Sequence, residues 1–145
     1  MSARYFLDTN IFAYAAHPIA SPKTAVALRL IEDGLDSGNG IVSYQVVQEF
    51  FSLAFRKFPK PMSGAEAEEF LTTVFRPLLA IQSSPALFVS ALQLYRQHRF
   101  SWYDSLIVAA AQEARCSVLY TEDLQDGLEL GDLKIRDPFR APPTN

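Results

Sequence analysis

The sequence has little cysteine or histidine and no long apolar run: its 145 residues include one cysteine and two histidines. Because Cys116 has no second cysteine to pair with, the chain cannot form an internal disulfide, which fits a reducing compartment. The apolar runs are far too short to cross a bilayer. The N-terminus lacks the charged start and long apolar core of a signal peptide. We therefore expect a cytoplasmic protein without a membrane segment.

An excess of positive charge is also missing. The sequence has 13 Lys and Arg against 16 Asp and Glu, a formal net charge of −3, whereas nucleic-acid-binding domains are usually basic. However, a cluster of acids reserved for divalent metal ions would bias this count, because the bound ions would reverse the local sign. The net charge therefore leaves a nucleic-acid partner open.

The composition that is present suits one compact globular domain. Hydrophobic residues make up 49% of the chain and charged residues 20%. Short apolar segments alternate with helical patterns, which predicts an α/β fold, a three-layer α/β/α sandwich. We expect a central, mostly parallel sheet of about five short strands. The predicted strands are residues 4–8, 41–42, 78–81, 117–120 and, more weakly, 133–136.

Serine residues predict where most of the helices begin. Serine is a preferred N-cap, and proline suits the first helical turn. Ser63 and Glu66 also have the spacing of a capping box. The expected N-caps are Ser21, Ser43, Ser63, Ser84 and Ser101. We expect a single domain over residues 1–137 and a loose tail over 138–145, which holds three of the nine prolines.

Four acidic residues follow the predicted strands or begin the helices beside them. Asp8 ends the first strand, and Asp123 follows the fourth. Glu49 lies in the second turn of the helix after the second strand. Asp104 lies in the first turn of a helix that is apolar nearly all round. Right-handed crossovers bring the carboxyl ends of parallel strands to one sheet edge, where such folds bind ligands. We therefore expect these carboxylates to meet.

Each acid also has an ordinary structural explanation. Asp8 suits the N-cap of the helix that follows it. Asp104, three residues after Ser101, suits a variant capping box and complements the helix dipole. Neither position requires a functional role when it is taken alone.

The other two acids are open to similar explanations. The spacing of Glu49 alone favours a solvent-exposed glutamate, paired weakly with Arg56. Asp123 suits a turn. Glu122 and Asp126 are neighbouring alternatives to Asp123 as the fourth acid of a site.

A meeting of these carboxylates would need a cation. Two carboxylates about 4 Å apart repel by roughly 4 kcal/mol at an effective dielectric constant of about 20. Oxygen ligands favour Mg²⁺ or Mn²⁺ over zinc, and neither His17 nor His98 has metal-ligand spacing. Such ions suit phosphodiester hydrolysis, because one can activate a water and a second can stabilise the leaving oxygen.

The acids can be given roles in such a site. We expect Asp8 to be the central metal ligand, with Asp104 as its partner. Glu49 and Asp123 would complete the shell, directly or through water. The residues expected to hold the carboxylates from a second shell are Thr9, Asn10 and Thr121.

Two basic clusters could contact the phosphates of a nucleic acid. Both lie at helix C-termini, where basic side chains complement the helix dipole, and we favour this simpler explanation. The first cluster is Arg56, Lys57 and Lys60, and the second is Arg96, His98 and Arg99. Four aromatic residues are expected to fill the core or a dimer surface rather than stack on bases: Phe50, Phe51, Phe55 and Phe58.

Four segments of the sequence resemble the PIN-domain ribonucleases, and within them the VapC toxins of toxin–antitoxin pairs. The resemblance covers essentially the whole chain, with the segments in the family's order and at its usual spacing. The segments are Leu7-Asp8-Thr9-Asn10, Glu49 in a helix, Trp102 to Ala110, and Thr121-Glu122-Asp123-Leu124-Gln125.

This resemblance implies an Mg²⁺- or Mn²⁺-dependent endoribonuclease that forms homodimers and is neutralised by a cognate antitoxin. The residues that it assigns to the acidic site are Asp8, Glu49, Asp104 and Asp123. The choice of Asp123 over Asp126 stays open here.

Two other functions remain as alternatives. Phosphatases of the haloacid-dehalogenase type also begin with an aspartate after the first strand, but they usually have a second acid two residues later, where this chain has Asn10. The same fold could instead serve as a metal-binding interaction module that has no catalytic activity.

Overall fold

β1 (Tyr5–Leu7) lies inside a six-stranded sheet in the computed structural model, which describes residues 3–140. The strand order is β3-β2-β1-β4-β6-β5. The pairs β1–β2, β1–β4, β2–β3 and β4–β6 are parallel, whereas β5 pairs antiparallel with β6. The remaining strands are β2 (Gly40–Ser43), β3 (Leu79–Ile81), β4 (Val118–Tyr120), β5 (Glu129–Leu130) and β6 (Leu133–Arg136).

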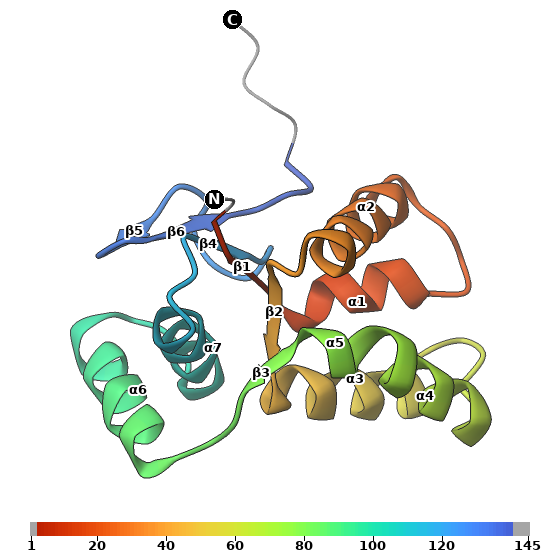
Figure 1. Cartoon of the computed structure of the whole chain (residues 1–145), viewed down its shortest axis with the longest axis horizontal. Helices are drawn as coiled ribbons and strands as arrows, with labels where there is room; N and C mark the ends of the chain where they lie inside the picture. The colour runs from red at the N-terminus through yellow and green to blue at the C-terminus, as the bar shows by residue number, and fades with distance from the viewer. Residues whose placement is uncertain (1–2, 141–145) are drawn as a thin grey trace, which may run out of the picture.

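Helices cover both faces of this sheet and confirm the predicted α/β sandwich. Figure 1 shows α6 and α7 on one side of the sheet, and α1 to α5 gathered on the other. The helices are α1 (Thr9–Ala16), α2 (Pro22–Ser37), α3 (Tyr44–Arg56), α4 (Gly64–Phe70), α5 (Arg76–Leu78), α6 (Pro85–Gln97) and α7 (Trp102–Glu113), with a π-helical segment over Leu71–Phe75 between α4 and α5.

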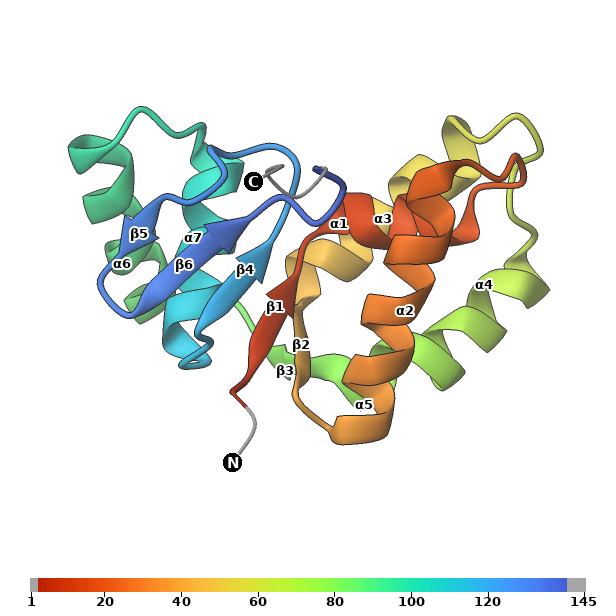
Figure 2. The same ribbon diagram turned by 90° about the horizontal axis from the view of Figure 1, so that it is seen from above.

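The parallel strands end at the same edge of the sheet. Figure 2 shows β1, β4 and β6 side by side and pointing the same way, with α1 starting from the end of β1. Leu7 pairs with Tyr120, so the residues that follow β1 and β4 leave the sheet together. This register positions Asp8 beside the segment that begins at Thr121.

All five expected N-cap serines precede a helix, and three of them cap it through a side-chain hydrogen bond. The hydroxyl oxygens of Ser63, Ser84 and Ser101 each accept a backbone N–H three residues later, at 3.1 Å. Ser43 precedes α3 as expected but does not cap it through its side chain. Its buried hydroxyl has no hydrogen-bond partner within residues 3–140.

The sequence predicted about five strands and missed β5. This strand has two residues, an exposed Glu129 and a buried Leu130, too few to give a pattern of alternation. It forms because Gly131 adopts a positive φ of 61° and turns the chain back into β6. The expected third strand also starts one residue late, since Leu78 ends α5.

Aromatic side chains fill the core beside α3. Phe50 is fully buried and packs near Phe12, Phe70 and Phe75, with ring centroids between 4.9 and 6.5 Å. Among the four phenylalanines expected in the core or a dimer surface, Phe55 is 45% exposed.

The C-terminal segment is described as far as Arg140. Phe139, in the expected loose tail, packs its ring against Tyr14 of α1 at a centroid distance of 5.0 Å. The rest of that tail, residues 141–145, lies outside the described residues. Within residues 3–140, every helix is too short or too polar to cross a membrane.

Candidate active site

Asp8 lies at the base of the site and is 5% exposed. Its Oδ1 accepts the backbone N–H of Thr9 at 2.7 Å, so it does cap α1, and its Oδ2 accepts the Thr121 hydroxyl at 2.8 Å. Burial, together with the charges of Asp123 and Glu49, raises the pKa of Asp8 to about 7, although the two hydrogen bonds lower it. A capping role alone does not explain an acid buried beside two others.

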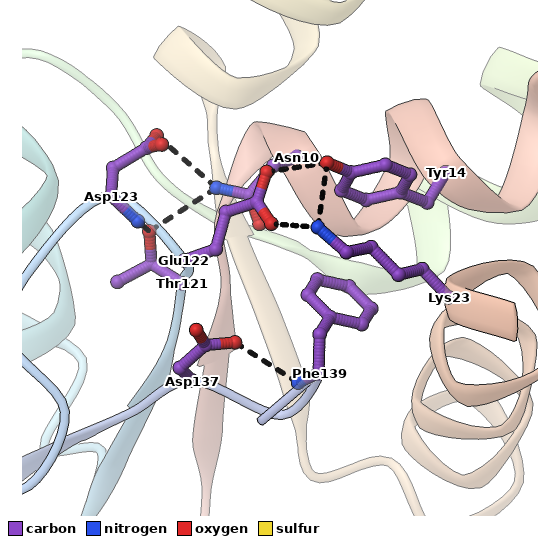
Figure 3. Close-up of polar contacts among 8 residues, drawn as sticks. All are labelled: Asn10, Tyr14, Lys23, Thr121, Glu122, Asp123, Asp137 and Phe139. Atoms are coloured by element: carbon purple, nitrogen blue, oxygen red, sulfur yellow. Dashed lines mark hydrogen bonds and ion pairs between the residues drawn. The ribbon is translucent and has the colours of Figure 1, made fainter. Parts of the chain in front are cut away.

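Thr121 connects three parts of the site through one fully buried hydroxyl. The hydroxyl donates to Asp8 and accepts from the Asn10 side-chain amide at 3.2 Å and from the Asp123 backbone N–H at 3.1 Å. A hydroxyl has one donor and two acceptor positions, so all three are in use. Figure 3 shows Thr121 between Asn10 and Asp123. Thr121 therefore joins the ends of β1 and β4 to α1.

Glu49 faces the site from the second turn of α3. Its Oε1 accepts the Thr9 hydroxyl at 3.2 Å and the Gln45 side-chain amide at 3.3 Å. Burial raises its pKa, and the charges of Asp104 and Asp123 add to this increase. The ion pair with Arg56 that its spacing suggested is not present in the described part of the chain.

Asp104 and Asp123 complete the group of acids. Asp104, half-buried in the first turn of α7, has a pKa raised by burial and by the charge of Asp123, although a hydrogen bond with Ser101 lowers it. Asp123 accepts the Asn10 side-chain amide at 3.2 Å. Asp8, Glu49 and Asp104 therefore each lie close enough to Asp123 to be influenced by its charge. We call Asp8, Glu49, Asp104 and Asp123 the acid cluster.

A family model described as the PIN domain matches residues 5–125 of the sequence. The chain belongs to the PIN domain family. The matched residues include the whole acid cluster. No curated protein is similar enough in sequence to count as a match.

Three solved structures of other proteins share the fold of this chain. The crystal structure of Mycobacterium tuberculosis VapC20, described as a sarcin–ricin loop cleaving toxin, has 20% sequence identity and a TM-score of 0.63 over 82% of this chain and 89% of that one. FitAcB from Neisseria gonorrhoeae has 16% identity and a TM-score of 0.62, over 94% and 99% of the two chains. FitAB bound to an IR36 DNA fragment has 12% identity and a TM-score of 0.64, over 97% and 99%.

The two alternative acids of this PIN domain are engaged elsewhere. Glu122 accepts the Tyr14 hydroxyl at 2.6 Å and pairs with Lys23 at 2.8 Å, on the far side of Asn10 from Asp123 (Figure 3). Asp126 accepts the backbone N–H of Asp137 at 2.9 Å. Asp123 is therefore the acid that this loop directs toward Asn10.

The donor atoms of the PIN site suit a hard cation. They are carboxylate, hydroxyl and amide oxygens, and the buried Oδ1 of Asn10 has no hydrogen-bond partner in the described structure. As the side chains lie, no three Asp, Glu, His or Cys residues within residues 3–140 converge tightly enough to hold an ion. Metal binding would therefore require the carboxylates to rotate toward one another.

The sequence did not predict the residues that orient the loop after β4, which carries Glu122 and Asp123. Lys23 of α2 lies 4.7 Å from the centre of the Tyr14 ring and 5.5 Å from that of Phe139, and it pairs with Glu122. Lys23 and Glu122 are 99 residues apart, and neither belongs to a recognisable motif. Gln45, which supports Glu49, has the helical i, i+4 spacing that could have indicated the contact.

Proposed function

We propose that this PIN domain is a metal-dependent endoribonuclease that hydrolyses RNA phosphodiester bonds and acts as the toxin of a toxin–antitoxin pair. The observation that carries the proposal is the acid cluster, in which carboxylates come from four separate segments and the charge of Asp123 raises the pKa values of Asp8, Glu49 and Asp104. The fold shared with VapC20, described as a toxin that cleaves the sarcin–ricin loop, supports the same conclusion.

Mg²⁺ or Mn²⁺ is the proposed cofactor, and all four acids of the cluster are its proposed ligands. The bound ion would make a water nucleophilic and stabilise the leaving oxygen of the phosphodiester. Burial and mutual repulsion make the charged carboxylates unfavourable without a cation. A divalent ion would offset this cost, which is why the same groups fit a metal better than they fit a purely structural role.

Three side chains outside the cluster are proposed to position it. Each donates one hydrogen bond to one carboxylate, so the orientation of that carboxylate is fixed before a metal binds. The pairs are Thr9 with Glu49, Asn10 with Asp123, and Thr121 with Asp8.

The proposed partners are an RNA substrate, a cognate antitoxin and a second copy of the chain. The dimer is supported by exposed apolar side chains along the outer face of α6, which between them are 41–55% exposed. They are Phe88, Val89, Leu92 and Tyr95. Their spacing gives one stripe on the helix, opposite the buried Leu87, Ala91 and Leu94.

The test is cleavage of RNA by the purified protein. We expect cleavage with Mg²⁺ or Mn²⁺, none after a chelator is added, and at least a hundredfold loss in Asp8→Asn or Asp104→Asn. Asp126→Asn is the matched control, because the asparagine oxygen can still accept the Asp137 N–H and the acid cluster is untouched. Full activity in Asp8→Asn and Asp104→Asn would place the active site elsewhere.

The same variants separate the enzyme from an interaction module without catalysis. Expression of the wild-type protein should arrest growth, and Asp8→Asn should abolish the arrest while leaving the protein folded. A module that acts only by binding would keep its cellular effect in Asp8→Asn.

A further inference from the structure

A hollow of about 410 Å³ runs along α3, and its lining includes Glu49 of the acid cluster. Its wall is the exposed face of α3, and its far end is basic. Tyr103, the residue before Asp104, closes it from the α7 side. The residues of the wall and the far end are Gln45, Gln48, Ser52, Leu53, Arg56 and Lys57.

The charge changes sign along this hollow. Glu49, Ser52 and Arg56 follow one another at helical spacings of three and four residues, so they share one face of α3. At a rise of 1.5 Å per residue, the seven steps from Glu49 to Arg56 span about 10 Å. A polyanion with one phosphate at a metal-loaded acid cluster would therefore bring its next phosphates to Arg56 and Lys57, both of which are exposed.

Tyr103 offers an aromatic face at the side of the hollow. Its side chain is 62% exposed, which is more than for any other exposed aromatic residue in the part of the chain that the structure describes. Its backbone is held in place, because its carbonyl accepts the Gln45 side-chain amide at 3.1 Å. Exposed aromatic rings on a fixed backbone are the usual platforms on which unpaired bases stack. The exposed Gln48 amide, with a donor and an acceptor, lies on the same wall.

We propose that this α3 groove binds an unpaired nucleotide of RNA beside the bond that is cut, with the base on Tyr103 and a following phosphate at Arg56 and Lys57. The inference rests on the proposed function, because it takes the substrate to be RNA, and it adds which residues of this chain hold the strand beside the cleaved bond. In this proposal Arg56 and Lys57 bind phosphates in addition to complementing the dipole of α3.

The lining favours RNA over a protein segment. Amides, a hydroxyl, two cations and one aromatic ring make up most of the wall, and Leu53 is its one aliphatic residue. A docked peptide would need an apolar anchor pocket at its centre, whereas backbone phosphates and a stacked base need cations and a ring.

The test measures kcat and KM for cleavage of a labelled pool of random single-stranded RNA, and of the same RNA annealed to its complement. We expect the wild-type protein to cut the single strands and to cut the duplex at least tenfold less.

Tyr103→Ala should raise KM roughly five- to hundredfold, the range expected for one stacked base, and Tyr103→Phe should restore it. Arg56→Ala should raise KM and weaken its salt dependence, whereas Arg29→Ala, an exposed arginine on α2, should change neither.

The outcomes are separable. Cleavage by wild type with an unchanged KM in both Tyr103→Ala and Arg56→Ala, or equal cleavage of duplex and single strand, would overturn the groove and leave the nuclease proposal standing. An unchanged KM together with loss of a co-purifying protein partner would assign the groove to that partner instead. A wild-type protein that cuts no RNA with Mg²⁺ or Mn²⁺ would overturn the proposed function and the groove with it.

Discussion

The Thr121 hydroxyl makes three hydrogen bonds that hold together segments far apart in the sequence. Thr121→Val keeps the shape of the side chain but leaves Asp8, Asn10 and the Asp123 N–H each without one partner. Because buried polar groups without partners are costly, we expect a loss of about 1–3 kcal/mol in the free energy of unfolding. Urea denaturation should show this loss, and Thr121→Ser should recover most of it. Equal stability of the three proteins would mean that the hydroxyl holds nothing in place.

The raised pKa of Asp8 predicts an unusual pH dependence of stability without metal. The folded-state pKa is about 7 and the ordinary value is 3.8, so the folded state binds the proton more tightly than the unfolded state. The contribution of Asp8 to stability is therefore fully present below about pH 4, and it is lost as the pH rises to about 7. The loss is on the order of 4 kcal/mol.

Thermal unfolding in a chelator should reveal this dependence. We expect the wild-type Tm to be higher at pH 5.5 than at pH 8, and Asp8→Asn to show a smaller difference. The raised pKa values of Glu49 and Asp104 should leave part of the trend in the variant. Adding Mn²⁺ at pH 8 should raise the wild-type Tm. A wild-type Tm that increases steadily from pH 5.5 to pH 8 in the chelator would contradict the burial of a charged Asp8.

The four acids differ in how far the sequence could reveal them. Asp8 and Asp104 were expected in the site from their positions at a strand end and in an apolar helix, and the charge of Asp123 raises the pKa of each. The spacing of Glu49 favoured a surface residue, because the Thr9 hydroxyl that holds it comes from another helix 40 residues earlier. Whether these acids bind a metal stays a prediction.

At the scale of elements, the loop after β4 is held by the group formed by Tyr14, Lys23 and Glu122. Lys23 is 41% exposed, so its ion pair adds at most about 1 kcal/mol to stability. Its larger effect is to keep Glu122 turned away from the acid cluster. We expect Lys23→Met to cost little in Tm but to reduce RNA cleavage several-fold, because Asp123 loses its fixed orientation. Cleavage at the wild-type rate would show that the loop needs no such support.

The packing of α2 on β2 depends on two glycines. A Cβ at Gly40 would lie 2.8 Å from the Cα of Gly34, where backbone faces backbone. Gly40→Ala should therefore force the two elements apart and lower the free energy of unfolding by about 1–3 kcal/mol. Gly64→Ala, where a Cβ meets nothing within 4 Å, is the control, and a similar loss in both variants would refute the steric explanation.

Local signals explain why the elements were more predictable than the loops. Serine caps and the glycine after α2 act within a few residues, so the helix starts followed from the sequence. The orientation of Glu122 depends on Tyr14, 108 residues earlier in the chain, and no local pattern carries that information. For the same reason, the choice between Asp123 and its neighbours could not be made from spacing.

At the scale of the whole molecule, the apolar stripe on α6 predicts self-association. Leu92, 49% exposed, lies near the middle of this stripe. We expect the wild-type protein to sediment as a dimer and Leu92→Glu to shift it to the monomer, because a buried unpaired charge opposes the interface. Ile19→Glu, at an exposed apolar residue on the loop before α2, should leave the mass unchanged. A monomeric wild type would remove the proposed homodimer.

The gathering of the four carboxylates around a divalent ion is tested most directly by titrating Mn²⁺ into the metal-free protein and measuring heat or electron paramagnetic resonance. We predict saturable binding by the wild type and by Asp126→Asn, and at least tenfold weaker binding by Asp104→Asn. Equal affinity in Asp104→Asn and the wild type, or no binding by the wild type, would contradict the account.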